Sequence, residues 1–104
     1  MFNAMETNMF INIMQFPPIQ PGKEAEFLEW FAWSNEQYAQ HKGFVRRRLL
    51  KPRKDGQYLA LVEHESFETF MAMHTSPTQA EAMQRVKPLF AGNPAPQFYD
   101  VVVG

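Results

Sequence analysis

The chain has 104 residues and a formal net charge of −1, and this length suits one domain with one hydrophobic core. Because nucleic acids and anionic membranes select basic protein surfaces, the nearly neutral charge argues against both partners and favours a small molecule or another protein. Cysteine is absent, which excludes disulfides and thiol nucleophiles and suits the reducing cytoplasm.

The N-terminal part predicts an extension, a strand and a helix. Residues 1–8 lack the basic start of an export signal and are expected to form a flexible extension before a single domain over residues 9–104. Residues 9–16 are rich in β-forming side chains and end at a Pro-Pro pair, which indicates the first strand. A helix is expected from about residue 22 to residue 40. Its apolar face carries Phe27, Trp30, Phe31, Ser34 and Tyr38.

Two strands joined by a tight turn are expected next. Residues 44–50 follow a helix-stopping glycine and read as the second strand. Residues 58–65 read as the third strand, and the turn before them contains an Asp-Gly pair, which favours the positive φ that hairpins require. These segments together predict an antiparallel hairpin.

A run of three arginines lies in the second strand. Alternation along a strand places Arg47 on one face, and its two arginine neighbours together with Phe44 on the other. The run therefore makes no continuous basic patch, and a solvated edge or an ion pair across subunits with Glu63 or Glu65 is expected. Arg47 is the candidate anion clamp of the three.

A second helical region is expected in two pieces. A serine can cap residues 67–74, and a Ser-Pro pair at residues 76 and 77 offers a second cap, so the helix should kink between them. The second piece carries an amphipathic run that extends to Phe90. A loop rich in helix and strand breakers over residues 92–96 precedes the last strand, residues 97–103.

The order of elements defines the expected fold class. The order β-α-β-β-α-β is the split βαβ, ferredoxin-like arrangement of the α+β class, with one antiparallel sheet and two helices on a single face. No element remains to cover the other face, and both sides of the first and last strands carry apolar residues. A homodimer in which two sheets pack face to face is therefore expected, with a pocket in each subunit between its helices and its sheet.

Short motifs along residues 9–103 resemble those of a known family. The chain has a Pro-Gly-Lys turn before an aromatic-rich helix, a Gly-Phe pair before the second strand, and an acidic residue and a serine leading into a helix with an early phenylalanine. They stand at Pro21-Gly22-Lys23, Phe27 with Trp30, Gly43-Phe44, Glu65-Ser66 and Phe70. With these motifs in this order, the chain resembles the antibiotic biosynthesis monooxygenase family. The resemblance implies a dimeric α+β barrel that oxidises a small electron-rich phenol, quinol or polyketide-like molecule with O2 and uses no metal or flavin cofactor.

A branch of that family binds and degrades haem, using an asparagine in the first strand and a tryptophan and a histidine in the second helical region. The tryptophan and histidine positions carry Met73 and Met83 here. The asparagine position falls on Gln15, or on Asn12 if the Pro-Pro pair marks an insertion. A haem-binding or haem-degrading relative stays open as an alternative, because His74 lies next to the tryptophan position.

The chemistry that the resemblance implies needs a general base, since O2 reacts sluggishly with closed-shell molecules and a deprotonated phenol supplies the necessary electron density. Histidine is the first choice, with a free pKa of about 6.5. The candidates are His74, next to the predicted kink, and His64, on the third strand, whereas His41 is expected to be solvated. A helix C-terminal cap at His74 and a core position at His64 are the structural explanations that compete with catalysis.

Asn12 is the candidate hydrogen-bonding group of the site. It lies among apolar side chains of the first strand, so either a backbone group or a ligand must satisfy its amide. Trp30, Trp33 and Tyr38 could stack on a planar ligand, but ordinary core packing is the favoured explanation for them. The predicted substrate-binding residues are Trp30, Trp33, Tyr38, Arg47, Phe70, Met73 and Met83.

Metal binding is not expected, because Glu63 and Glu65 face away from His64 and the histidines form no His-x-x-x-His pair. A non-catalytic dimeric module that binds a hydrophobic metabolite would have the same pocket, and it is the alternative to a monooxygenase. The sequence does not specify the substrate.

Overall fold

The computed structural model describes residues 9–104, and the extension predicted over residues 1–8 lies outside them. Four strands form one antiparallel sheet in the order β2-β3-β1-β4. They are β1 (Phe10–Gln15), β2 (Phe44–Leu50), β3 (Leu59–His64) and β4 (Ala95–Asp100).

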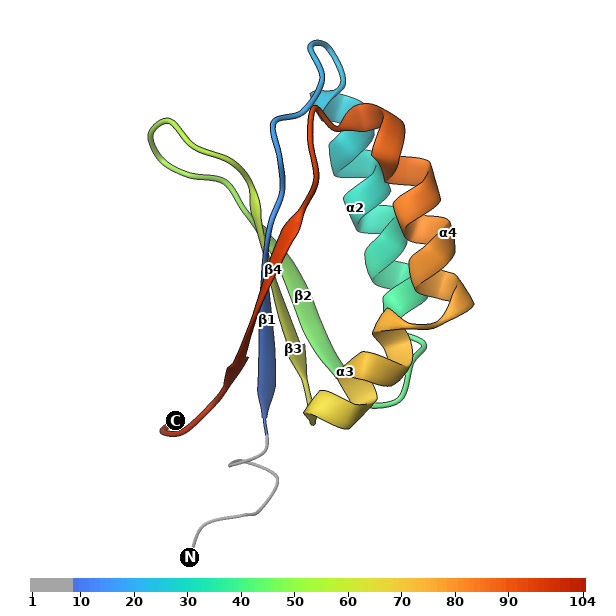
Figure 1. The fold of residues 1–104 in the computed structure, drawn as a ribbon, viewed down its shortest axis with the longest axis vertical. Helices are drawn as coiled ribbons and strands as arrows, with labels where there is room; N and C mark the ends of the chain where they lie inside the picture. The colour runs from blue at the N-terminus through green and yellow to red at the C-terminus, as the bar shows by residue number, and fades with distance from the viewer. Residues whose placement is uncertain (1–8) are drawn as a thin grey trace, which may run out of the picture.

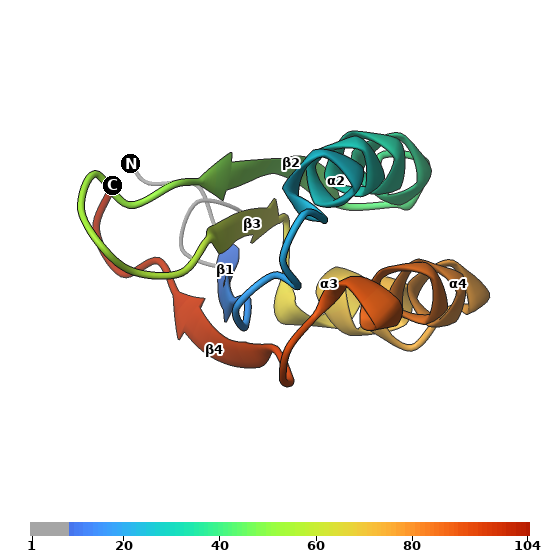
Figure 2. The ribbon, with the colours of Figure 1, turned by 90° about the horizontal axis from the view of Figure 1, so that it is seen from above.

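The helices all cover the same face of this sheet. In Figure 1 they stand to the right of the sheet, and the view from above in Figure 2 shows no helix of residues 9–104 on the opposite face. They are α2 (Glu24–Tyr38), α3 (Phe67–His74), α4 (Pro77–Val86) and the short 3-10 helix η1 (Lys87–Leu89). This arrangement confirms the predicted ferredoxin-like α+β fold. None of the helices within residues 9–104 is long and apolar enough to cross a membrane.

The second helical region consists of two separate helices, as predicted. Ser66 Oγ accepts a hydrogen bond from the backbone N–H of Thr69 at 3.1 Å and so caps α3. Ser76 Oγ accepts a bond from the backbone N–H of Gln79 at 3.4 Å, and Pro77 occupies the first helical position of α4. The two capping serines, ten residues apart, therefore each start a separate helix.

The predicted helix ends were wrong at several places. Helix α2 begins at Glu24 and not at residue 22, because Gly22 has a φ of +78°, outside the right-handed helical region. It ends at Tyr38, two residues before the predicted end. The amphipathic run after Pro77 leaves the α-helical geometry at Val86 and continues as η1, because Pro88 cannot donate a backbone hydrogen bond within an α-helix.

The last strand also differs from the prediction, since β4 covers Ala95–Asp100 and not residues 97–103. Pro96, which was assigned to the preceding loop, lies within the strand opposite Met14. Strand β4 is an edge strand that pairs with β1 alone, and an edge strand tolerates a proline because one row of its backbone groups needs no partner.

The core lies between the sheet and the helices and is largely aromatic. Phe27 of α2 is fully buried, and its ring lies 5.1 Å from Phe16 and 5.3 Å from Tyr58, both of which flank strands of the sheet. Trp30 Nε1 donates a hydrogen bond to the carbonyl oxygen of Ala82 at 2.9 Å, which ties α2 to α4. These contacts fix both long helices against each other and over the sheet.

The opposite face of the sheet carries apolar side chains from all four strands. Ile11 and Ile13 of β1 pair with residues of β3 and β4, and Leu61 of β3 stands directly opposite Ile13. Leu50 and Tyr99 on the same face are 42% and 46% exposed. This uncovered surface is called the outer sheet face below.

Candidate functional site

A small cavity lies between the sheet and the helices and has a volume of about 30 Å³. Its lining comes from the inward positions of β1, β2 and β3, from α2, α3 and α4, and from the segment before β4. The lining residues are Asn12, Met14, Phe16, Trp30, Tyr38, Arg47, Ala60, Val62, Phe70, Met73, His74, Gln79, Met83 and Pro94. The structure thus brings together most of the predicted site residues, and His64 and Trp33 are the exceptions.

Arg47 reaches the cavity from the edge strand β2. Its Nη1 donates hydrogen bonds to Ser34 Oγ and Asn35 Oδ1, both at 2.8 Å. The guanidinium carbon lies 3.9 Å from the ring centre of Phe31 and 4.8 Å from that of Tyr38, distances at which an aromatic ring attracts a cation. These contacts hold the positive charge over α2.

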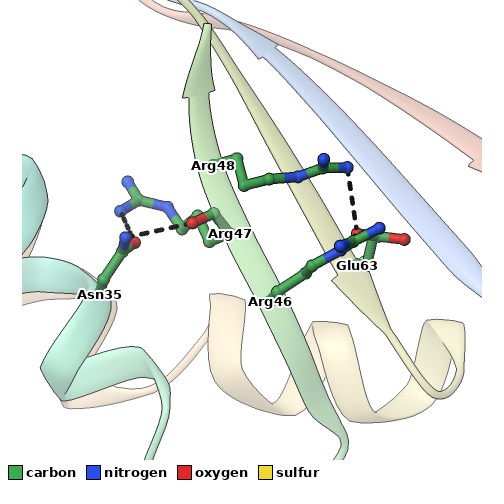
Figure 3. Close-up of polar contacts among 5 residues, drawn as sticks. All are labelled: Asn35, Arg46, Arg47, Arg48 and Glu63. Carbon is green, nitrogen blue, oxygen red and sulfur yellow. Dashed lines mark hydrogen bonds and ion pairs between the residues drawn. The ribbon is translucent and has the colours of Figure 1, made fainter.

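No carboxylate within residues 9–104 pairs with Arg47. Figure 3 shows the contrast with its neighbours, because Arg46 and Arg48 turn to the other face and both reach Glu63. Burial lowers the pKa of Arg47 to about 10, and the nearby Tyr38 acts in the opposite direction. Arg47 is therefore still cationic at neutral pH, and its charge is unneutralised.

A β-bulge explains why Arg47 faces inward. Phe44 pairs with His64, but Arg46 pairs with Glu63, so Val45 is an extra residue between them. After the bulge Arg47 stands opposite Val62, which points into the cavity. The predicted alternation placed Phe44 on the face of Arg46, and this was wrong, because a bulge reverses the alternation that follows it.

Asn12 lies at the middle of β1 and is 3% exposed. Its Oδ1 has no hydrogen-bond partner among the described residues. A buried acceptor without a partner costs about 1–3 kcal/mol. Of the two possibilities left open by the sequence, a backbone partner is not found within residues 9–104, and the oxygen is free to accept a bond from a ligand.

His74 is the last residue of α3 and lines the cavity. Its imidazole stacks on the ring of Phe70, with the ring centres 5.2 Å apart and an interplanar angle of 19°. The ring centre of Phe98 lies 6.5 Å away, with the two rings nearly perpendicular. Burial lowers the pKa of His74 below its ordinary value. The imidazole is therefore neutral at pH 7 and can accept a proton.

His64 and Trp33 lie outside the cavity lining. His64 is fully buried beneath α3, with Nδ1 at 3.1 Å from Thr69 Oγ1 and Nε2 at 3.3 Å from Met73 Sδ. Trp33 lies on the outer side of α2, where the Arg85 guanidinium stands 4.1 Å from its ring centre. Of the two tryptophans predicted to bind substrate, Trp30 therefore lines the cavity and Trp33 does not.

The burial of His64 predicts a pH dependence of stability. Burial, and secondarily the charge of His41, lower the pKa of His64 to about 4. Because the folded pKa is lower than the unfolded value of about 6.5, this stabilisation is complete above pH 6.5 and is lost as the pH falls through 4, and it amounts to at most about 3 kcal/mol. Urea unfolding between pH 7 and pH 4 should show this loss, and His64→Gln should flatten it. If His64→Gln loses as much unfolding free energy between pH 7 and pH 4 as the wild type, groups other than His64 cause the loss. The same measurement on His74→Gln gives the part of the loss that is due to His74.

Sequence reasoning missed three residues that shape the polar side of the cavity. Ser34 and Asn35 hold Arg47, and Asn35 Nδ2 also donates to the backbone oxygen of Arg47 at 3.1 Å. Gln79 Oε1 accepts a hydrogen bond from Tyr38 OH at 2.5 Å. The sequence around Gln79 indicates only the start of a helix, and the packing of α2 beside α4 is what brings Gln79 to Tyr38. Among residues 9–104, no group of three or more His, Asp or Glu side chains could hold a metal ion.

Comparison with known proteins gives a family match. The family described as antibiotic biosynthesis monooxygenase matches residues 9–85. The comparison with curated proteins found no match.

Several solved structures share the fold at low sequence identity. A Caulobacter crescentus protein, provisionally assigned as an antibiotic biosynthesis monooxygenase, is 22% identical over 93% of this chain and 92% of the other, with a TM-score of 0.83. SnoaB, a cofactor-independent oxygenase from Streptomyces nogalater, is 21% identical over 90% and 93%, with a TM-score of 0.78. Rv0793 from Mycobacterium tuberculosis is 12% identical over 92% and 97%, with a TM-score of 0.79.

Proposed function

This chain belongs to the antibiotic biosynthesis monooxygenase family, and we propose that it is a cofactor-independent monooxygenase that acts on a small electron-rich phenol or quinol with O2. The family match carries the reaction class. The choice of a phenolic substrate rests on the side chains of the cavity. A reaction without a cofactor is supported by SnoaB, which has the same fold and is a cofactor-independent oxygenase.

One observation supports the substrate class above the others. The cavity combines a neutral imidazole at His74, an unneutralised cation at Arg47 and an unpaired acceptor at Asn12 Oδ1. A phenol that loses its proton to the imidazole becomes an anion, which the guanidinium stabilises in a largely apolar surrounding. A second hydroxyl group on the same ring can donate to Asn12. The base at His74, the cation at Arg47 and the acceptor at Asn12 therefore suit an aromatic ring that carries hydroxyl groups.

The reaction is balanced without a bound cofactor. His74 accepts the phenolic proton, and the phenolate passes one electron to O2, after which the two radicals combine to form a C–O bond at a ring carbon. The resulting peroxide anion takes the proton back from His74 and becomes a hydroperoxide. Its O–O bond then breaks, the ring carbon loses its hydrogen, and the two fragments leave as water while a C=O bond forms. The net change is a phenol and O2 to a quinone and water. Arg47 remains beside the negative charge through these steps.

The free cavity has room for about two water molecules, since one water needs roughly 10–15 Å³ of such volume. An aromatic ring can enter only if side chains of the lining move. Met73 and Met83 are suited to this, because an unbranched thioether side chain changes rotamer easily.

Oxygen uptake with a panel of phenols and hydroquinones tests the proposal. With ¹⁸O₂ as the gas, we expect one labelled oxygen atom in the quinone product and the other in water. Uptake that yields stoichiometric hydrogen peroxide and unlabelled product would show simple autoxidation and contradict a monooxygenase. A panel member that binds, quenching the fluorescence of Trp30 beside the cavity, but drives no oxygen uptake would favour the non-catalytic binder.

The outer sheet face supports a homodimer as the working form of the protein. The outer sheet face carries an apolar strip formed by Ile11, Ile13 and Leu61, and no helix of the described part of the chain, residues 9–104, covers it. Burial of apolar surface contributes about 25 cal/mol per Å², so the pairing of two such faces is favourable. We propose that the two sheets of a dimer pack across this face.

Light scattering at micromolar concentration checks this proposal. The wild-type chain should have the mass of a dimer, and Ile13→Lys should shift it to the mass of a monomer, because each interface would then bury two unpaired ammonium groups. Leu28→Lys is the matched control, since Leu28 is 43% exposed on α2, away from the sheet. A monomer for the wild-type chain, or an equal shift in Leu28→Lys, contradicts pairing through the outer sheet face.

A further inference from the structure

A groove lies on the outside of α4, next to the cavity. It has a volume of about 460 Å³ and runs between the helix and the segment that leads to β4, which pass near each other at the upper end of Figure 1. Ala80 and Met83 line it from α4 at helical spacing, Lys87 lines it from the start of η1, and Phe90 and Pro94 line it from the segment that follows.

The groove and the cavity are neighbours that share part of their lining. Met83 and Pro94 belong to both. Sites for small molecules have volumes of about 300–1,000 Å³, a range that includes the groove and excludes the cavity. A ligand whose hydroxylated end reaches Arg47 and Asn12 must therefore leave most of its bulk on the groove side of Met83.

We infer that this groove is a second subsite, and that the substrate is an aromatic molecule with an apolar extension, either fused rings or an alkyl chain, that lies along α4. The inference rests on the proposed function for the reacting end of the molecule. Ala80, Met83, Phe90 and Pro94 supply the apolar part of the lining, and Gln84, Lys87 and Asn93 supply its polar part. Met83 stands between the two spaces and moves aside when the ring enters.

Binding of alkylated hydroquinones without oxygen tests the subsite. The probes are methyl-, butyl- and octylhydroquinone, titrated by calorimetry. We expect the dissociation constant of the wild-type protein to fall by about two- to fourfold for each added methylene in the groove. Ala80→Trp fills the groove, and in this variant the octyl probe should bind no more than about threefold tighter than the methyl probe.

Ala72→Trp is the matched control, because Ala72 is an exposed residue of α3 that lines neither space. It should keep the wild-type dependence on chain length. A wild-type protein without that dependence, or an Ala80→Trp variant that retains it, overturns the second subsite. Oxygen uptake on the same samples separates the two proposals. If binding depends on chain length but no probe is oxidised, the proposed monooxygenase activity is contradicted and the second subsite is supported. If the probes are oxidised but binding does not depend on chain length, the second subsite is contradicted and the monooxygenase activity is supported.

Discussion

Arg47→Met should lose most of its activity and keep its stability. Removing one preorganised donor that stabilises a developing anion lowers kcat by about 10²–10³, and Arg47 is the cation of the cavity without a carboxylate partner among residues 9–104. Methionine fills a similar volume without charge, so a partly buried guanidinium no longer has to leave water on folding. The free energy of unfolding should therefore stay the same or rise.

Steady-state oxygen uptake and urea unfolding on the same preparation measure both effects. Arg48→Met is the control, because Arg48 lies on the outer sheet face and pairs with Glu63 at 3.5 Å. It should retain activity. Arg47→Lys keeps a charge but cannot bond to Ser34 and Asn35 in the same fork geometry, so it should recover part of the lost rate. If Arg47→Met unfolds more easily and remains active, the Arg47 side chain has a structural role, and the proposal that it stabilises the substrate anion is wrong.

His74→Gln should lower kcat/KM by about 10²–10⁴, the usual contribution of a positioned general base. Glutamine keeps a polar side chain of similar size at the end of α3 but cannot accept the proton. Because burial lowers the pKa of His74, the wild-type rate should fall on the acid side only below the ordinary histidine value of about 6.5. In His74→Gln this acid limb should disappear.

The pH profile of kcat/KM separates catalysis from packing, because a merely structural role of His74 would leave the shape of the profile unchanged. Added imidazole should restore part of the rate of His74→Gln. His41→Gln is the matched control, since the Nε2 of His41 contacts Thr78 Oγ1 at 2.9 Å outside the cavity lining. A His74→Gln variant with the wild-type acid limb would exclude His74 as the base.

Hydrophobic spacing was sufficient to predict the architecture and the aromatic part of the cavity lining. The stripe of Phe27, Trp30 and Tyr38 on one helix is a local pattern, and all three are buried against the sheet. Two Ser caps predicted the break between α3 and α4. Such features depend on neighbours within one or two turns of the chain, which is why sequence alone specifies them.

Long-range features were not predictable in the same way. The position of Pro96 within β4 depends on β4 being an edge strand, and the contact between Tyr38 and Gln79 depends on which side of α2 meets α4. Trp33 lies only three residues after Trp30, yet it falls at the border of the buried stripe and faces outward. The bulge at Val45 has no local signature, since it reflects how β2 pairs with β3.

The bulge at Val45 and the run of three arginines after it together determine which arginine faces the helices. If β2 slid by one position along β3, every side chain after the bulge would exchange faces. The residue that then turned toward the helices would be Arg46 or Arg48, so the cation would be replaced by an identical neighbour. Insertions or deletions just before the triplet can therefore be absorbed without loss of the charge, whereas a point substitution at Arg47 removes it in the register that the chain adopts.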